Sequence, residues 1–215
     1  LFSGGEMDRR IGEIFSTLLY PRLHVILGNT QLAERLAGPI AEFRSAVPRD
    51  AVRTYYQSSE FQQRQQQIAR GEIYPRVLVR TCRWTTFLKY CSSDFEKAFR
   101  QLGCQTRYLI EKNDAQYLSP EYVWQQLGDF RPDVFFSISH DRASAPFLPR
   151  ELPYICYMQD RCGPLQELPS LKEAITGQDL FICLCRVYSQ ILGEKGVPDR
   201  QKFIMPVPVE ETLFY

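Results

Sequence analysis

The chain has 215 residues, of which 44% are hydrophobic and 13% aromatic, and its formal net charge is +1. This length and composition suit a folded protein with one full core and argue against general disorder, while the near balance of charges favours neither nucleic acid nor an anionic membrane as a partner. Because no apolar run reaches the ~20 residues of a membrane helix and no signal-peptide pattern opens the chain, we expect a cytoplasmic protein without a membrane span.

Residues 1–72 are predicted to form a helical extension. The segments 31–47 and 51–70 carry apolar residues at helical spacing. A glutamine run in the second segment is expected to form a solvated helix face. Three aromatic side chains of that segment are candidates for a partner surface: Tyr55, Tyr56 and Phe61.

Residues 73–206 alternate between short apolar runs and amphipathic segments. The runs are predicted to be buried strands over 77–82, 106–110, 133–139, 154–158 and 180–184, with a further strand near residue 203. Short apolar strands that alternate with helices indicate βαβ units with right-handed crossovers. The predicted fold is therefore an α/β, Rossmann-like, doubly wound parallel sheet.

Four helices are expected between these strands. A capping-box pattern from Ser93 to Glu96 predicts the start of the first, which ends at Gly103. The second starts at Ser119-Pro120 and its apolar face ends before Gly128. The third, over 165–175, is weakly patterned, and the fourth runs from 186 to 196.

The seven cysteines do not form a metal-ligand pattern. No C-x-x-C occurs, and Cys82, Cys156 and Cys183 fall inside predicted strands. We therefore expect reduced thiols that act as small hydrophobic residues, and no metal site.

Ligands of an open parallel sheet bind beyond the carboxyl ends of its strands, so the loops that follow the strands hold the candidate site. His140 and Asp141 are the candidate catalytic residues, since either could act as a base toward a hydroxyl group. For His140, a role in capping the loop is the alternative. The candidate substrate-binding residues are Arg83, Trp84, Thr85, Thr86, Arg142, Gln159 and Asp160.

Trp84 has two interpretations. Its ring could stack on an acceptor sugar, with the neighbouring threonine hydroxyls as hydrogen-bonding groups, or it could pack with Phe87 under the helix that follows. The segment 83–90 contains no glycine, and no G-x-x-x-x-G-K-[ST] occurs. The sequence thus argues against a dinucleotide-binding loop and a P-loop.

The end of the chain has a characteristic order of motifs. A Pro-x-Pro exit at 206–208 predicts that residues 207–215 begin a linker to a second domain. The residues that precede and form this exit resemble the end of the N-terminal domain of GT-B glycosyltransferases; they are Gln178–Cys183, Tyr188, Leu192, Gly196–Pro198, Phe203, Ile204, Pro206, Val209 and Phe214. The segment 149–160, which ends in Tyr157-Met-Gln-Asp, resembles a strand of the spore-maturation group of these enzymes.

The resemblance implies a glycosyltransferase of hexosyltransferase type when the protein is whole. It implies that this chain is the acceptor-side half, which binds a sugar or glycan. A C-terminal domain would hold the nucleotide-sugar donor, no cofactor or metal would be needed, and this half alone would be inactive. An inverting enzyme would take its base from this half, His140 or Asp141, whereas a retaining enzyme would need none.

The alternative is a Rossmann-like binding module without catalysis that recognises a carbohydrate, a nucleotide or a protein. The absence of a glycine-rich loop and the aromatic residues of the extension motivate it.

Overall fold

The computed structural model describes residues 47–112, 118–160 and 171–205. The chain divides into two compact units, residues 1–54 with 111–131, and residues 55–110 with 132–215. The predicted linker at 207–215 and nearly all of the predicted helix at 31–47 lie outside the described residues.

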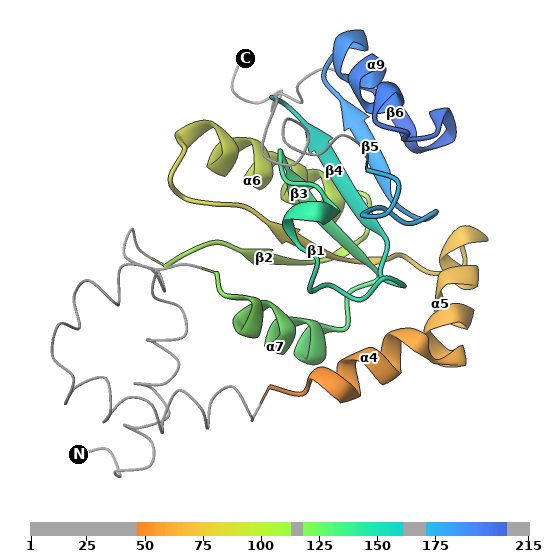
Figure 1. Cartoon of the computed structure of the whole chain (residues 1–215). Coiled ribbons are helices and arrows are strands. Elements are labelled where there is room, and N and C mark those ends of the chain that lie inside the picture. Colours follow the sequence, from red (N-terminus) through yellow and green to blue (C-terminus); the bar gives the residue numbers. More distant parts are fainter. Residues whose placement is uncertain (1–46, 113–117, 161–170, 206–215) are drawn as a thin grey trace, which may run out of the picture. The chain divides into compact units, whose positions relative to one another are not determined.

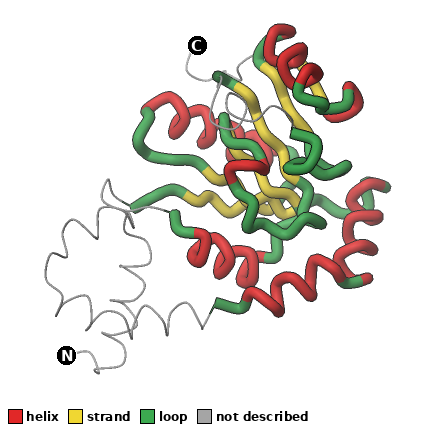
Figure 2. The backbone as a smooth tube through the Cα atoms, in the orientation of Figure 1, coloured by secondary structure: helices red, strands yellow, loops and turns green. Residues whose placement is uncertain are grey.

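The larger unit contains a single sheet of six parallel strands (Figures 1 and 2). The strands are β1 (Arg76–Arg80), β2 (Gln105–Leu109), β3 (Val134–Ile138), β4 (Tyr154–Met158), β5 (Leu180–Cys183) and β6 (Lys202–Ile204). Their order in the sheet is β2-β1-β3-β4-β5-β6. The chain thus moves outward from β1 to β2, returns to the other side of β1, and continues in the opposite direction. This order confirms the predicted Rossmann-like doubly wound α/β fold.

The centre of the sheet is buried on both faces, as the continuous apolar runs predicted. In β1, Val77, Leu78 and Val79 are all at most 1% exposed. Helix α6 (Thr86–Gln101) covers one face, where Phe95 packs against Phe136 of β3 with ring centroids 4.7 Å apart.

Helix α6 begins seven residues before the predicted capping box. Thr85 is the actual N-cap, and its hydroxyl accepts a hydrogen bond from the Leu88 amide at 3.3 Å. Ser93 lies inside the helix, so its assignment as the helix start was wrong. The sequence concealed this start because Phe87 and Tyr90, in the first turns, are exposed and do not extend the apolar face.

The helix predicted over 51–70 consists of two helices, α4 (Arg49–Gln57) and α5 (Ser59–Ala69). Ser58 separates them because its backbone is extended and its side chain accepts a hydrogen bond from the Phe61 amide. In the glutamine run the side chains of Gln62, Gln63, Gln66 and Gln67 are exposed, which agrees with the predicted solvated face.

The predicted partner surface on this segment was wrong. Tyr55, Tyr56 and Phe61 are 8%, 1% and 2% exposed, and their rings pack edge to face with centroids 4.9–5.7 Å apart. Edge-to-face packing of three buried rings is a core arrangement. These side chains stabilise the larger unit and are not available to a partner.

The C-terminal part of the sheet follows the prediction. Helix α9 (Arg186–Glu194) ends before Gly196, whose φ of +88° favours glycine, and a short 3-10 helix, η2 (Asp199–Gln201), leads into β6. The predicted helix at 165–175 differs, because residues 172–174 form a turn, none of the described residues 171–175 is helical, and the rest lies outside the described ranges.

In the smaller unit, α7 (Pro120–Phe130) has the predicted cap, since the Ser119 hydroxyl accepts from the Tyr122 amide at 3.2 Å. The helix continues through Gly128 to Phe130, so the end predicted from that glycine was too early. A side chain at Gly128 would lie 3.1 Å from Pro48, and close packing explains the glycine.

Within the described ranges, no helix has the length and apolar character required to cross a bilayer.

Candidate functional site at the carboxyl edge of the sheet

Three of the predicted loops lie next to one another because their strands are neighbours. Strands β1, β3 and β4 are consecutive in the sheet, so the loops that begin at Thr81, Ser139 and Gln159 share one edge, which we call the carboxyl edge. The order of strands reverses between β1 and β3. Ligands of doubly wound folds bind at this switch point.

The loop after β1 is fixed to α6 by a small hydrogen-bond network. Thr81 is buried, its hydroxyl donates to the Leu88 carbonyl at 3.2 Å, and it accepts from the Ser92 hydroxyl at 2.8 Å. The Thr85 hydroxyl accepts from the Leu88 amide as the N-cap of α6, so this predicted substrate-binding residue positions the start of the helix. Thr86, the first helical residue, is exposed, and Arg83 is half-buried.

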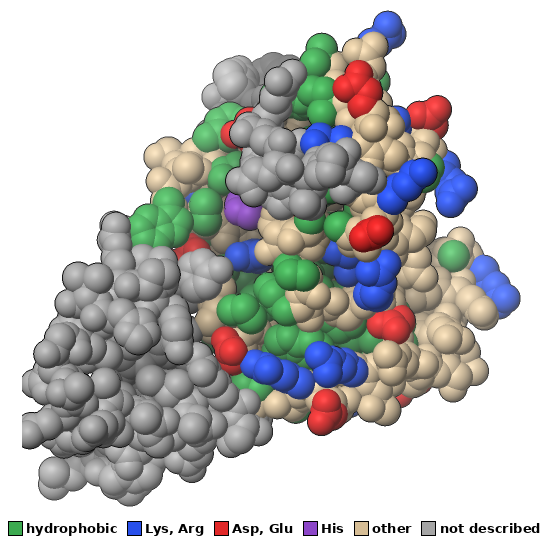
Figure 3. Space-filling model, viewed as in Figure 1, with side chains coloured by type: hydrophobic (Ala, Val, Ile, Leu, Met, Phe, Trp, Pro, Cys, Tyr) green, Lys and Arg blue, Asp and Glu red, His purple; other side chains and the backbone are tan. Residues whose placement is uncertain are grey.

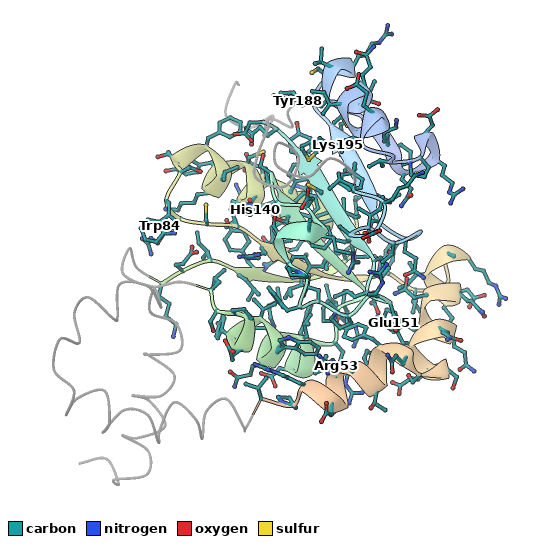
Figure 4. All side chains as sticks on the ribbon, in the orientation of Figure 1. Arg53, Trp84, His140, Glu151, Tyr188 and Lys195 are labelled. Atoms are coloured by element: carbon teal, nitrogen blue, oxygen red, sulfur yellow. The ribbon has the colours of Figure 1, made fainter. Side chains whose placement is uncertain are left out.

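Trp84 does not pack under α6. Its side chain is 50% exposed, as is that of Phe87, and Tyr90 is 61% exposed. Figure 4 shows Trp84 farther out from the sheet than His140, on the loop that enters α6. The alternative in which Trp84 and Phe87 are core residues was therefore wrong, and both rings are free to stack on a ligand.

The loops after β3 and β4 are joined at Ser139. This residue has a φ of +54°, the left-handed region that non-glycine residues seldom adopt. Its amide donates to the Tyr157 carbonyl at 2.8 Å, and its hydroxyl donates to the carboxylate of Asp160. The predicted residues Asp160 and His140 are thereby brought to the same place, and sparsely populated backbone conformations cluster at functional sites.

His140 is half-buried, and both its backbone and its ring are held. Its carbonyl accepts from the buried Tyr154 hydroxyl at 2.9 Å, and its ring Nδ1 lies 2.9 Å from the Ile138 carbonyl oxygen. A carbonyl can only accept, so Nδ1 carries the proton in this contact. In the neutral ring Nε2 then has the lone pair, which is the form that a general base requires.

Asp141 acts locally. Its side chain is 2% exposed and caps the 3-10 helix η1 (Arg142–Ser144) by accepting from the Ser144 amide at 3.1 Å. Burial raises the pKa of its carboxyl group above the ordinary value of 3.8, while the bonds from Ser144 act in the opposite direction. The capping role makes Asp141 a weaker candidate for the base than His140.

The structure does not bring Arg142 to the carboxyl edge. Its guanidinium is buried and binds both carboxylate oxygens of Asp179, which precedes β5, at 2.8 Å. It also donates to the Pro149 and Leu152 carbonyls, at 3.1 and 2.5 Å. With its donors used in this way, Arg142 anchors the connection between β3 and β4, and it is not placed to bind substrate.

Three buried polar atoms of the larger unit have no hydrogen-bond partner among the described residues, and all three belong to the carboxyl edge. They are Nη1 of Arg80, the hydroxyl of Tyr157 and Oε1 of Gln159. Burial and the nearby Cys91 raise the pKa of the Tyr157 hydroxyl to about 12, so it stays protonated and remains a donor. Buried polar groups in native proteins are nearly always paired, so each of these atoms is a candidate for pairing with a ligand. Tyr157 lies on the α6 face, with its ring 5.0 Å from that of Phe95, whereas Arg80 lies on the other face of the sheet.

The sequence singled out Gln159 and, as the start of the segment Tyr157-Met-Gln-Asp, Tyr157, but not Arg80. Arg80 lies inside a predicted strand, as the last residue of β1. A charged residue at the carboxyl end of an otherwise apolar strand was the available signal for Arg80.

On the face shown in Figure 3, basic and acidic side chains of the described residues are interspersed without a broad area of one sign. This face therefore gives no sign of a large electrostatic patch around the site.

Comparisons of the chain with protein-family models, with curated proteins and with solved structures found no match.

Proposed function

We propose that the chain is the acceptor-side half of a GT-B glycosyltransferase, which transfers a sugar from a nucleotide-sugar donor to a sugar or glycan. A donor-binding half would follow it in the whole protein. One observation carries the proposal: the loops after β1, β3 and β4 converge at the switch point with an exposed tryptophan, a histidine whose ring Nδ1 is held by the Ile138 carbonyl, and buried polar atoms that have no partner among the described residues. The order of sequence motifs that resembles GT-B enzymes supports the same assignment.

In the proposed reaction, His140 is the base of an inverting transfer. Its Nε2 accepts the proton of the acceptor hydroxyl while that oxygen bonds to the anomeric carbon of the donor sugar. The bond from the anomeric carbon to the phosphate oxygen breaks, and the nucleoside diphosphate leaves. The Ile138 carbonyl then stabilises the charged imidazolium through its contact with Nδ1.

The acceptor would be held by groups of the β1 and β4 loops. Trp84 offers a flat apolar surface for a sugar ring, while Thr86, Gln159 and Asp160 offer hydrogen-bonding groups to its hydroxyls. Arg83, in the loop after β1, would contribute a further hydrogen-bond donor to the acceptor at the same edge.

The test is turnover by the whole protein with a panel of nucleotide sugars, beside this chain alone. We expect transfer by the whole protein and none by this chain. His140→Gln removes the base and should lower kcat by about 100-fold or more. Glu151→Gln is the matched control, because Glu151 precedes β4 at the opposite edge of the sheet (Figure 4) and should leave kcat unchanged. Full activity of His140→Gln would contradict the assigned base.

A second candidate is a binding module without catalysis. It is favoured by the three aromatic side chains at the start of α6, Trp84, Phe87 and Tyr90, which are spaced three residues apart and at least half exposed. Binding of a glycan by the whole folded protein, with no turnover of any nucleotide sugar, would favour this function over transfer.

A further inference from the structure

Strand β1 carries two arginines, Arg76 and Arg80, whose hydrogen bonding can be compared directly. Arg76 and Arg80 are the first and last residues of β1, and their spacing of four places both side chains on the same face of the sheet. Arg76 donates from Nη2 to the Tyr55 hydroxyl at 2.9 Å and forms an ion pair with the carboxylate of Asp133. For Nη1 of Arg80, which is buried, the described residues provide no hydrogen-bond partner.

The position of Arg80 places its guanidinium beside the loop that carries His140. In the sheet Arg80 pairs with Ser137 of β3, three residues before His140. The hydroxyl of Tyr154, which donates to the His140 carbonyl, gives a second link. Burial raises the pKa of that hydroxyl and the neighbouring Cys156 adds to the shift, while the positive charge of Arg80 acts on it in the opposite direction, as a nearby cation must.

A buried guanidinium N–H without a partner is costly unless a ligand pairs with it. Because guanidinium is planar, always charged and has donors only, it selects an oxyanion, most effectively a carboxylate or a phosphate bound through two oxygens. A neutral sugar hydroxyl would satisfy the N–H but would leave the charge uncompensated.

We propose that Arg80 is a ligand-binding residue of the carboxyl edge and that the site accepts a molecule with an anionic group, a carboxylate or a phosphate, beside His140. This inference deepens the proposed function by giving the acceptor a charge, and it rests on that function only for the ligand's identity as an acceptor. Binding of the anion itself requires no glycosyl transfer, so the two can fail separately.

The first test uses stability and needs no ligand. If Arg80 is held for a ligand, Arg80→Met removes an unpaired buried N–H and should leave Tm unchanged or raise it by about 2 to 4 °C. Arg76→Met, the same substitution on the same strand and face, removes a paired guanidinium and should lower Tm by about 5 °C or more. An equal loss of Tm in both variants would overturn the proposal, because Arg80 would then be structural.

The second test measures binding by NMR titration of the whole chain with glucose, glucuronate and glucose 6-phosphate. The Nε–H resonance of Arg80, assigned by its absence in Arg80→Met, should shift with the two anions and not with glucose. Arg80→Met should weaken anion binding at least tenfold. Arg200→Met removes one exposed charge before β6 and should leave binding unchanged.

The tighter of the two anions identifies the ligand chemistry as carboxylate or phosphate. Absence of binding by both anions, or equal binding to wild type and Arg80→Met, would overturn the anion site. If both anions bind through Arg80 while the whole protein turns over no nucleotide sugar, the anion site stands and the proposed transferase function does not.

Discussion

The two edges of the sheet differ in how completely their buried polar groups are paired. At the amino edge, where the strands begin, the fully buried carboxylate of Asp133 accepts from Arg64 at 2.7 and 2.8 Å and from the Arg76 amide at 2.7 Å. At the carboxyl edge, Arg80, Tyr157 and Gln159 each bury a polar atom for which the described part of the chain offers no partner. The amino edge is thus built for stability, whereas the carboxyl edge retains bonding capacity for another molecule.

A second carboxylate repeats the amino-edge pattern. Asp179, just before β5, binds Arg142 through two oxygens and also accepts from the Thr176 amide at 2.8 Å. Both carboxylates precede a strand, are at most 1% exposed and carry a two-oxygen contact with arginine. Such contacts fix the start of a strand and the segment that leads to it.

The largest expected effect breaks the amino edge. Asp133→Ala removes the acceptor shared by two arginines and a backbone amide, so we expect a loss of about 3–5 kcal/mol in the free energy of unfolding, measured by urea denaturation. Asp94→Ala is the control, because its pair with Lys97, 3.4 Å long, lies at the surface and should change stability by less than about 0.5 kcal/mol. A loss below about 1 kcal/mol for Asp133→Ala would show that the network does not stabilise this edge.

A middle-sized effect compares the same substitution at both edges. Tyr56→Phe removes the hydroxyl that donates to the Pro132 carbonyl at 3.1 Å, and should cost about 1 kcal/mol. Tyr157→Phe removes a buried hydroxyl that has no partner in the described ranges, and should be neutral or gain about 1 kcal/mol. Chemical denaturation of both variants checks the difference. If Tyr157→Phe loses as much as Tyr56→Phe, the contrast between the edges is false at this position.

The smallest expected effect concerns pH. Because burial raises the folded-state pKa of Asp141, the fold favours its protonated form, and this contribution to stability is lost as pH rises above about 4. Asp141→Asn keeps an oxygen to accept from Ser144 and has no charge. The variant should therefore be slightly more stable than wild type near neutral pH, with a difference that shrinks toward about pH 4. Thermal unfolding across this range measures it, and a difference that grows on acidification would reverse the sign assigned to Asp141.

The sequence predicted the parallel sheet well because each strand is a short apolar run between clear breaks. It failed where a local pattern competed with the true boundary. Ser93 to Glu96 has the form of a capping box, yet the chain had already become helical at Thr86. Ser58 interrupts an apolar pattern that continues on both sides of it, and only its extended backbone reveals two helices.

The candidate site was predictable as a set of loops and not as a set of bonds. The rule that ligands bind beyond the carboxyl ends of strands selected the loops of His140 and Asp160, and the structure joins these loops through the bond from Ser139, the residue before His140, to Asp160. The same rule selected Arg142, because this residue follows His140 closely in the sequence. The ion pair that holds its guanidinium, with Asp179, joins distant parts of the chain and could not be predicted from the local sequence. Arg76 and Arg80 look equivalent in the sequence, and only their tertiary surroundings distinguish them.

The strand register has a consequence for how the chain folds. No two paired strands are joined by a tight turn: the closest pair in the sequence joins Phe135 to Tyr154, and β1 reaches Val134 of β3 from Val77. Each pairing must close a long loop before its contacts are gained, which makes parallel sheets slow to fold, typically in about milliseconds to seconds. The β3–β4 pair closes the shortest of these loops, so its pairing costs the least loop entropy. The connection between these two strands carries Ser139 and His140, so the least costly pairing of the sheet also builds the centre of the candidate site.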